Sequence, residues 1–191
     1  MKVVIIGGVA GGATAAARLR RLDEKAEIVV LERGGYVSYA NCGLPYYIGG
    51  VIKERGKLLL QTPESFKRRF NVDVRVKNEA IEILPEQKQV LVRRLEDGSE
   101  YAERYDKLIY SPGAKAIRPA FAEKCESIFT LRTVEDTFRL DDFIKDRSPA
   151  SAVVVGGGFI GLETAENLAE RGIRVTLVQL EDQVMPPFDY D

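Results

Sequence analysis

The sequence predicts an α/β fold in which two βαβ units are separated by an inserted antiparallel β crossover, and three observations support this. An unbroken β-branched run, Val3–Ile6, leads into the glycine-rich turn Gly7–Gly12. The same arrangement returns where Ala152–Val155 precedes the turn Gly156–Gly161. Between them lie alternating strand-like segments with a hairpin turn at Asp97-Gly98. A strand, a glycine turn and a helix in this order are typical of Rossmann-like units.

The first unit has the sequence features of a dinucleotide site. An Ala-rich helix is expected at Ala13–Leu22, followed by a strand at Glu27–Leu31 that ends at Glu32. Free backbone N–H groups at the start of the helix can bind a pyrophosphate, and the Glu32 carboxylate can accept hydrogen bonds from a ribose diol. Val9 departs from the Gly-x-Gly-x-x-Gly pattern, because it stands where the middle glycine is expected.

The composition is that of an ordinary globular protein and restricts the function. Hydrophobic residues make up 45% and charged residues 30%, with 28 Lys and Arg against 29 Asp and Glu. This balance gives no overall field that recruits nucleic acid or an anionic membrane, and no stretch approaches the roughly 20 apolar residues of a membrane span. We therefore expect a cytoplasmic protein with neither partner.

The chain has no histidine and two distant cysteines, Cys42 and Cys125. The absence of histidine excludes Ser-His-Asp and Cys-His catalysis and the common histidine metal sites within this chain. The cysteine spacing argues against a zinc site or a disulfide framework. We expect no metal site, and we interpret Cys125, which lies among charged residues, as structural.

Three polar residues of the first helix form a stripe. Thr14, Arg18 and Arg21 recur at the spacing of one helix face. Two guanidinium groups and a hydroxyl can hold a phosphate group of a second ligand there. A solvated basic face explains the pattern equally well, so both interpretations remain open.

The Gly- and Tyr-rich segment 34–50 contains Cys42, which is expected to begin a short helix that accepts Pro45 in its first turn. A thiol at a helix start is activated as a thiolate. Cysteine is also among the most often buried residues. A reactive thiol and an inert core thiol therefore remain even alternatives on the local sequence.

The middle of the chain alternates between helix and strand. Thr62 caps a short helix that begins at Pro63 and ends in the basic cluster Lys67–Arg69. Further strands are expected at Val72–Val76, Ala80–Leu84, Gln89–Leu95, Glu100–Arg104 and, as a buried strand, Lys107–Tyr110. A strand at Ser127–Leu131 and a helix from the capping box of Thr133 and Asp136 to about Lys145 follow.

The second unit follows a linker at residues 148–151 and fits the Gly-x-Gly-x-x-Gly spacing fully. A helix at Leu162–Arg171 and a strand at Arg174–Val178 continue it. Gln179 stands where an acidic ribose ligand is expected, and Glu181 and Asp182 follow without an arginine to bind a 2′-phosphate, which favours NADH over NADPH. Two units imply two dinucleotides, with domains at residues 1–148 and 149–191.

Together these motifs resemble the pyridine nucleotide-disulfide oxidoreductase family, and the resemblance covers all 191 residues. Within that family, the segment Ser38–Tyr46 is similar to the single-cysteine branch of coenzyme A-disulfide and coenzyme A-dependent persulfide reductases. Glutathione and lipoamide reductases carry Cys-x4-Cys, whereas Tyr47 occupies the second position here. The resemblance implies an enzyme that passes electrons from NAD(P)H through FAD to Cys42, the catalytic residue, which reduces coenzyme A disulfide or a persulfide.

The resemblance also implies three sets of binding residues. FAD lies on the first unit, with Gly7, Gly8, Ala10, Gly11, Gly12, Glu32, Arg33, Ala80, Ser111, Pro112, Gly113 and Arg132. NADH or NADPH lies on the second, with Gly156, Gly158, Phe159, Ile160, Gly161, Glu163 and Gln179. Coenzyme A is held by Thr14, Arg18, Arg21, Ser38, Asn41 and Arg69, where Arg69 replaces a basic residue that some relatives carry at the position of Phe70.

Two alternatives remain beside this main interpretation. The chain can come from an NADH oxidase or peroxidase, in which Cys42 cycles through a sulfenic acid. It can also act as a nucleotide-binding module with no turnover of its own. Because the second unit stops soon after its second strand, we expect an N-terminal fragment of a homodimeric enzyme, with the fragment inactive alone.

Overall fold

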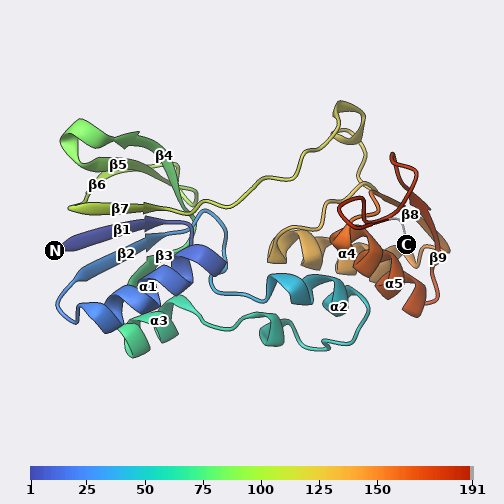
Figure 1. Ribbon diagram of the computed structural model, residues 1–191, viewed down its shortest axis with the longest axis horizontal. Coiled ribbons are helices and arrows are strands. Elements are labelled where there is room, and N and C mark those ends of the chain that lie inside the picture. The colour runs from blue at the N-terminus through green and yellow to red at the C-terminus, as the bar shows by residue number, and fades with distance from the viewer. Residues whose placement is uncertain (190–191) are drawn as a thin grey trace. The chain divides into compact units, whose positions relative to one another are not determined.

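The computed structural model describes residues 1–189, which divide into two compact units (Figure 1). Unit 1 comprises residues 1–39 and 59–114, and unit 2 comprises residues 40–58 and 115 onward. Segment 40–58 thus belongs to the same unit as the second glycine turn, although it directly follows the first βαβ unit. These compact units differ from the predicted nucleotide-binding domains, whose boundary at residue 148 stays a prediction.

Unit 1 is built on a four-stranded parallel sheet covered by helices on one face (Figure 1). The strand order is β3-β2-β1-β7. The strands are β1 (Lys2–Ile6), β2 (Glu27–Leu31), β3 (Asp73–Arg75) and β7 (Lys107–Tyr110), and the helices are α1 (Ala10–Leu22) and α3 (Pro63–Phe70).

The central strands of this sheet are buried on both faces, which explains the continuous apolar run of β1. Val3 and Ile5 pack with Ala16 of α1 and Phe66 of α3. Val4 and its neighbours on the opposite face pack against the antiparallel crossover. Leu22, at the end of α1, is 67% exposed and takes no part in this core.

The predicted antiparallel crossover is confirmed. It consists of η3 (Pro85–Gln87) and three strands in the order β4-β5-β6, with bounds β4 (Asn78–Leu84), β5 (Gln89–Arg94) and β6 (Glu100–Arg104). The hairpin between β5 and β6 turns at Gly98, whose φ is +75°. Val90 and Val92 of β5 are fully buried against the parallel sheet, which anchors the crossover to it.

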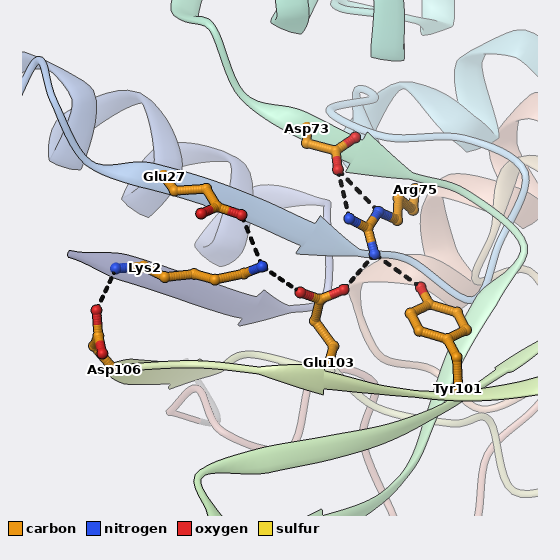
Figure 2. Close-up of polar contacts among 7 residues, drawn as sticks. All are labelled: Lys2, Glu27, Asp73, Arg75, Tyr101, Glu103 and Asp106. Carbon is orange, nitrogen blue, oxygen red and sulfur yellow. Dashed lines mark hydrogen bonds and ion pairs between the residues drawn. The ribbon is translucent and has the colours of Figure 1, made fainter.

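An ionic network centred on the buried Glu103 carboxylate also ties the crossover to the parallel sheet (Figure 2). The Glu103 side chain on β6 is 8% exposed and lies between two cations: Lys2 Nζ contacts Oε1 at 2.6 Å, and the Arg75 guanidinium donates to Oε2. Each cation has a second carboxylate, Glu27 for Lys2 and Asp73 for Arg75. Burial alone would raise the pKa of Glu103, but the hydrogen bonds from Lys2 and Arg75 outweigh it and lower that pKa.

Unit 2 contains a second, two-stranded parallel sheet with helices around it. Its apolar core includes Ile48, Ile144, Leu168 and Ile173. The elements are η1 (Asn41–Gly43), α2 (Leu44–Ile48), η2 (Arg55–Leu58), η4 (Ala120–Ala122), α4 (Val134–Arg147), β8 (Ser151–Val155), α5 (Phe159–Glu170) and β9 (Arg174–Val178).

Two strand predictions are wrong in part or whole. Ser127–Leu131 forms no strand, because Arg118 organises this segment as a loop: its guanidinium donates to the carbonyls of Ala122, Cys125 and Ile128. Strand β7 is present but not buried, since β1 is its only neighbour in the described sheet, and Tyr110 is 68% exposed.

Both predicted helix caps in the middle of the chain are confirmed. Thr62 and Ser65 form a reciprocal capping box at the start of α3, with proline at the first position. Thr133 and Asp136 form another at the start of α4, which runs to Arg147, two residues beyond the expected end. Local sequence therefore determines where these helices begin.

Candidate functional site

The first glycine turn is a close-packed cradle in which side chains have no room. Gly7 has φ +98°, and a Cβ there would lie 2.0 Å from the Ser111 carbonyl oxygen. A Cβ at Gly12 would lie 1.8 Å from the Gly7 carbonyl oxygen, and one at Gly11 would lie 2.4 Å from Ser111 Oγ. Strand β1, helix α1 and the segment after β7 thus meet at this turn.

Helix α1 begins inside the glycine turn, at Ala10 rather than at the expected Ala13. Its N-cap residue is Val9, which provides no side-chain cap, and the first turn contains no acidic residue. The first backbone N–H groups of a helix lack intrahelical partners, and together with the helix dipole they favour an anion. Val9 therefore leaves these N–H groups without a side-chain cap.

Glu32, at the end of β2, is held directly beside this turn. Its Oε2 accepts from the Gly8 N–H at 2.7 Å, and its Oε1 accepts from the Gly34 N–H at 2.6 Å. The Glu32 N–H donates to the Arg75 carbonyl at 2.9 Å, so the network around Arg75 supports its backbone. A carboxylate accepts about four hydrogen bonds, so two positions remain for a ribose diol.

Other predicted FAD residues lie in the same unit. Arg33 is exposed and 3.7 Å from Glu79, next to Ala80 on β4. Ser111 donates its N–H to the Ile6 carbonyl at 2.8 Å, and Pro112 and Gly113 are exposed beyond it.

The arginines of α1 have different roles. Thr14, Arg18 and Arg21 are exposed, and within residues 1–189 none of these side chains has a hydrogen bond, ion pair or ring contact. Arg20, on the other side of the helix, donates to five backbone carbonyls, those of Asp23, Glu24, Ala26, Phe70 and Asn71. The guanidinium groups of Arg18 and Arg21 are therefore available to a ligand, whereas that of Arg20 is structural.

Two further predicted coenzyme A residues belong to unit 1. Ser38 has φ +46°, and its backbone is fixed by bonds to the Gly8 carbonyl and the Leu60 N–H, both 2.9 Å long. Arg69 is exposed on α3, with its guanidinium 5.1 Å from the centre of the Phe70 ring.

The second glycine turn repeats the geometry of the first. Gly156 has φ +105°, and a Cβ at Gly161 would lie 1.9 Å from the Gly156 carbonyl oxygen. Gln179 Oε1 accepts from the Gly157 N–H at 2.8 Å, the same contact that Glu32 makes with Gly8. Gly158 caps α5 without a side-chain bond, and a Cβ there would meet nothing within 4 Å.

The other predicted residues of this turn lie on α5, which begins at Phe159, three residues before the predicted start. Phe159 and Ile160 are exposed, and Glu163 lies one turn further along the helix. The first turn of α5 contains no acidic residue. This helix start is therefore also suited to an anion.

Cys42 is exposed, which favours an accessible thiol over a core thiol. It lies in η1, immediately before α2, and Pro45 is in the first turn of α2 as expected. Its neighbour Asn41 has a buried Oδ1 with no hydrogen-bond partner among the described residues. Cys42, Asn41 and the half-buried Arg132 belong to unit 2, unlike the first glycine turn.

Cys125 is half-buried, and the Ser127 hydroxyl lowers the pKa of its thiol. Within residues 1–189, no group of three or more His, Cys, Asp or Glu side chains could hold a metal ion. None of the helices in that range has the length and apolar character needed to cross a membrane.

The parallel sheets and the two glycine turns define an α/β protein of the nucleotide-binding class. The chain belongs to the pyridine nucleotide-disulphide oxidoreductase family, whose sequence profile matches residues 1–191. The predicted family and fold class are thereby confirmed.

Relatives of this family include reductases that act on sulfur compounds. The chain is 42% identical to coenzyme A disulfide reductase of Staphylococcus aureus over 190 residues, which are 100% of this chain and 43% of that protein. It resembles reduced CoADR-RHD of Bacillus anthracis at TM-score 0.96 and 55% identity, covering 99% of this chain and 34% of that one. It resembles an NAD-dependent persulfide reductase of A. fulgidus at TM-score 0.92 and 39% identity, covering 97% of this chain and 35% of that one.

A more distant relative is the water-forming NADH oxidase of Lactobacillus brevis, with TM-score 0.89 and 28% identity, covering 97% of this chain and 41% of that one. The chain spans less than half the length of each of these proteins.

Proposed function

We propose that this chain contributes the FAD site, part of the NAD(P)H site and the redox cysteine of a reductase for coenzyme A disulfide or persulfide. The observation that carries the proposal is the contrast on α1, where Arg18 and Arg21 have free, exposed guanidinium groups while Arg20 is fully engaged. Free guanidinium groups are what the phosphates of coenzyme A need, and the similarity to a coenzyme A disulfide reductase favours this role over a solvated basic face.

The first glycine turn fits FAD on two structural grounds. Gly7 and Gly12 pack so closely on the carbonyl oxygens of Ser111 and Gly7 that no Cβ fits, which permits the tight strand-to-helix turn that a pyrophosphate site requires. Glu32 retains acceptor positions for the ribose while its existing bonds keep it beside the turn. Ala10, Gly11, Arg33, Ala80, Ser111, Pro112, Gly113 and Arg132 are proposed to complete the site.

The second turn is suited to a pyridine nucleotide, since nothing lies within 4 Å of a Cβ at Gly156 or Gly158, while Gly161 packs against the Gly156 carbonyl oxygen and keeps the turn tight. Gln179 brings no positive charge to the ribose, and Glu181 and Asp182 would repel a 2′-phosphate. We therefore propose NADH over NADPH as the electron donor. Phe159, Ile160 and Glu163 are proposed to line the nucleotide.

The chain's own residues would act on the substrate in two steps. The phosphates of coenzyme A bind Thr14, Arg18 and Arg21, with Ser38, Asn41 and Arg69 around the rest of the molecule. The Cys42 thiolate attacks one sulfur of the disulfide, so that one coenzyme A leaves as a thiolate and a mixed disulfide forms at Cys42. Bound FAD supplies the relay of two electrons from NAD(P)H. These two electrons and one proton release the second coenzyme A thiol and restore the Cys42 thiolate.

A cytoplasmic homodimer is part of the same proposal. The similarity to single-cysteine reductases supports it, and size-exclusion chromatography with light scattering of the full-length enzyme tests the oligomeric state. A full-length enzyme that is monomeric at all concentrations would reject that part alone.

The experiment begins with the visible absorption spectrum of the purified chain before and after addition of FAD. Flavin bound at about one per chain supports the first site, and a protein that takes up no FAD rejects it for this chain. Turnover of coenzyme A disulfide is then compared, in the full-length reductase, between Cys42→Ser and the control Cys125→Ser. We expect Cys42→Ser to retain flavin and lose turnover, while Cys125→Ser retains both.

Coenzyme A affinity distinguishes this proposal from an oxidase. We expect Arg18→Met to weaken coenzyme A binding about tenfold or more, because a charge-assisted phosphate contact is lost. Arg104→Met, at an exposed residue of β6 in the same unit, is the matched control. NADH-dependent oxygen consumption without coenzyme A binding would favour the oxidase or peroxidase alternative, and nucleotide binding without any turnover would favour a non-catalytic module.

A further inference from the structure

We propose that Arg171 is a positioning residue for Cys42, acting through the C-terminal end of α2. The inference rests on the proposed role of Cys42 in the reductase. It assigns to helix α5, which begins at the second glycine turn, the additional task of holding the segment that presents the redox thiol. All residues involved belong to unit 2.

The central contact is a buried ion pair between α4 and the end of α5. Arg171 Nη1 donates to Asp141 Oδ1 at 2.8 Å and also to the carbonyl oxygen of Ile48 at 3.0 Å. The Asp141 side chain is 3% exposed, and its second oxygen accepts from Lys145 Nζ at 2.6 Å. A single guanidinium therefore joins α4, α5 and the last residue of α2.

A second contact between α2 and α5 does not involve charge. Asn167 is 3% exposed, and its Nδ2 donates to the Glu163 carbonyl at 2.7 Å. A Cβ at Gly49, the residue that ends α2, would lie 2.0 Å from Asn167 Oδ1. The end of α2 thus lies directly against the α5 side chain, and only glycine allows this distance.

Helix α4 holds the other side of segment 40–58. The Tyr47 and Phe138 rings are 5.5 Å apart, and the Arg55 guanidinium lies 4.5 Å above the Phe138 ring. Arg55 also pairs with Asp142 at 2.6 Å, but both side chains are 52% exposed, so this pair contributes little. The buried Asp141–Arg171 pair is therefore the stronger constraint on the segment.

The constraint reaches Cys42 through continuous helical backbone. The 3₁₀ turn Asn41–Gly43 runs into α2 without a break, and Leu44 and Ile48 are 3% and 0% exposed. A shift at Ile48 is transmitted to Cys42 because close-packed, hydrogen-bonded backbone moves as one body. Reaction of Cys42 with a disulfide requires a defined approach, so the rate of turnover depends on this placement.

The test is amide hydrogen exchange of the chain, read separately for residues 44–49 and for the remainder of unit 2. Arg171→Met is compared with Arg174→Met, whose arginine is exposed at the start of β9. Gly49→Ala, which separates α2 from α5 without changing charge, is compared with Gly56→Ala, where a Cβ meets nothing within 4 Å. Arg171→Lys keeps a positive charge for Asp141.

We expect Arg171→Met and Gly49→Ala to accelerate exchange in residues 44–49 about tenfold or more relative to β8 and β9. Arg174→Met and Gly56→Ala should leave it within about twofold, and Arg171→Lys should recover part of the protection. Acceleration spread evenly over unit 2 would mean a general structural role, and unchanged exchange in both variants would mean no constraint; either result overturns the proposal. If Arg171→Met does not fold, Arg171→Lys decides the outcome, because exchange in residues 44–49 at the wild-type rate in that variant would overturn the proposal.

The functional consequence is measured in the full-length reductase, as separate changes in kcat and in KM for coenzyme A disulfide. We expect Arg171→Met and Gly49→Ala each to lower kcat about 10- to 100-fold and to leave KM within about twofold, because the proposed phosphate ligands on α1 belong to the other unit. An unchanged kcat would overturn the positioning role. Exchange requires no turnover, so the constraint on α2 and the reductase function can fail independently.

Discussion

We expect the substitution Glu103→Gln to lower the free energy of unfolding by about 2–4 kcal/mol. Glu103 is 7% exposed and accepts from two cations, Lys2 and Arg75 (Figure 2). Glutamine keeps the shape but loses the charge, and its amide nitrogen faces one of the cations. The loss is less than that of an isolated buried pair, because Lys2 and Arg75 keep Glu27 and Asp73 as partners.

The assay is urea and thermal unfolding followed by far-UV circular dichroism, since the chain contains no tryptophan. The expected loss corresponds to a decrease in Tm of about 4–16 °C. Glu100→Gln is the matched control, because Glu100 lies on the same strand and pairs with Arg93 at 2.8 Å, but both side chains are more than 40% exposed. That control should cost less than about 1 kcal/mol. Equal losses from the two substitutions would refute the reasoning.

The pH dependence provides a second check. The pKa of Glu103 is lowered in the folded protein, so its contribution is present above the ordinary glutamate pKa of about 4.3 and is lost as pH falls through the lowered value. The difference in stability between the wild type and Glu103→Gln should therefore shrink below about pH 4. A difference that stays constant down to about pH 2 would show that the charge of Glu103 is not its source.

Three further predictions concern unit 1 and α4. Gly12→Ala places a Cβ 1.8 Å from the Gly7 carbonyl oxygen, so we expect the variant to lose FAD uptake and to have a lower Tm. A variant that binds FAD normally would show that close packing at Gly12 is not required for the FAD site. Arg20→Met should lower the free energy of unfolding in urea by about 2–3 kcal/mol without weakening coenzyme A binding. Arg18→Met should weaken coenzyme A binding without lowering the free energy of unfolding. The same phenotype for both arginines would show that α1 does not separate these roles. Thr133→Ala removes a capping box and should lower stability by about 1 kcal/mol, and an unchanged Tm would speak against the cap.

The elements with local signals could be predicted from the sequence. The β-branched run of β1, the two glycine turns and the threonine caps of α3 and α4 each act within a few residues. The strand expected at Ser127–Leu131 was wrong because this segment is a loop in which the Ile128 carbonyl is bonded by Arg118, ten residues away. Side-chain bonds at that distance leave no periodic pattern in the sequence.

The residues of the candidate site also fall into those that the sequence indicates and those whose contacts only the structure reveals. The sequence by itself determined the family and the two glycine turns, and it indicated Glu32 and Gln179, because a dinucleotide-binding unit requires these residue types at fixed spacing. The resemblance to single-cysteine reductases indicated Cys42. Only the tertiary structure decided that Arg18 is free while Arg20 is engaged, that Glu103 is a buried carboxylate between two cations, and that Arg171 reaches Ile48. These contacts join residues far apart in the chain, and which arginine or carboxylate finds a partner depends on packing rather than on its neighbours in sequence.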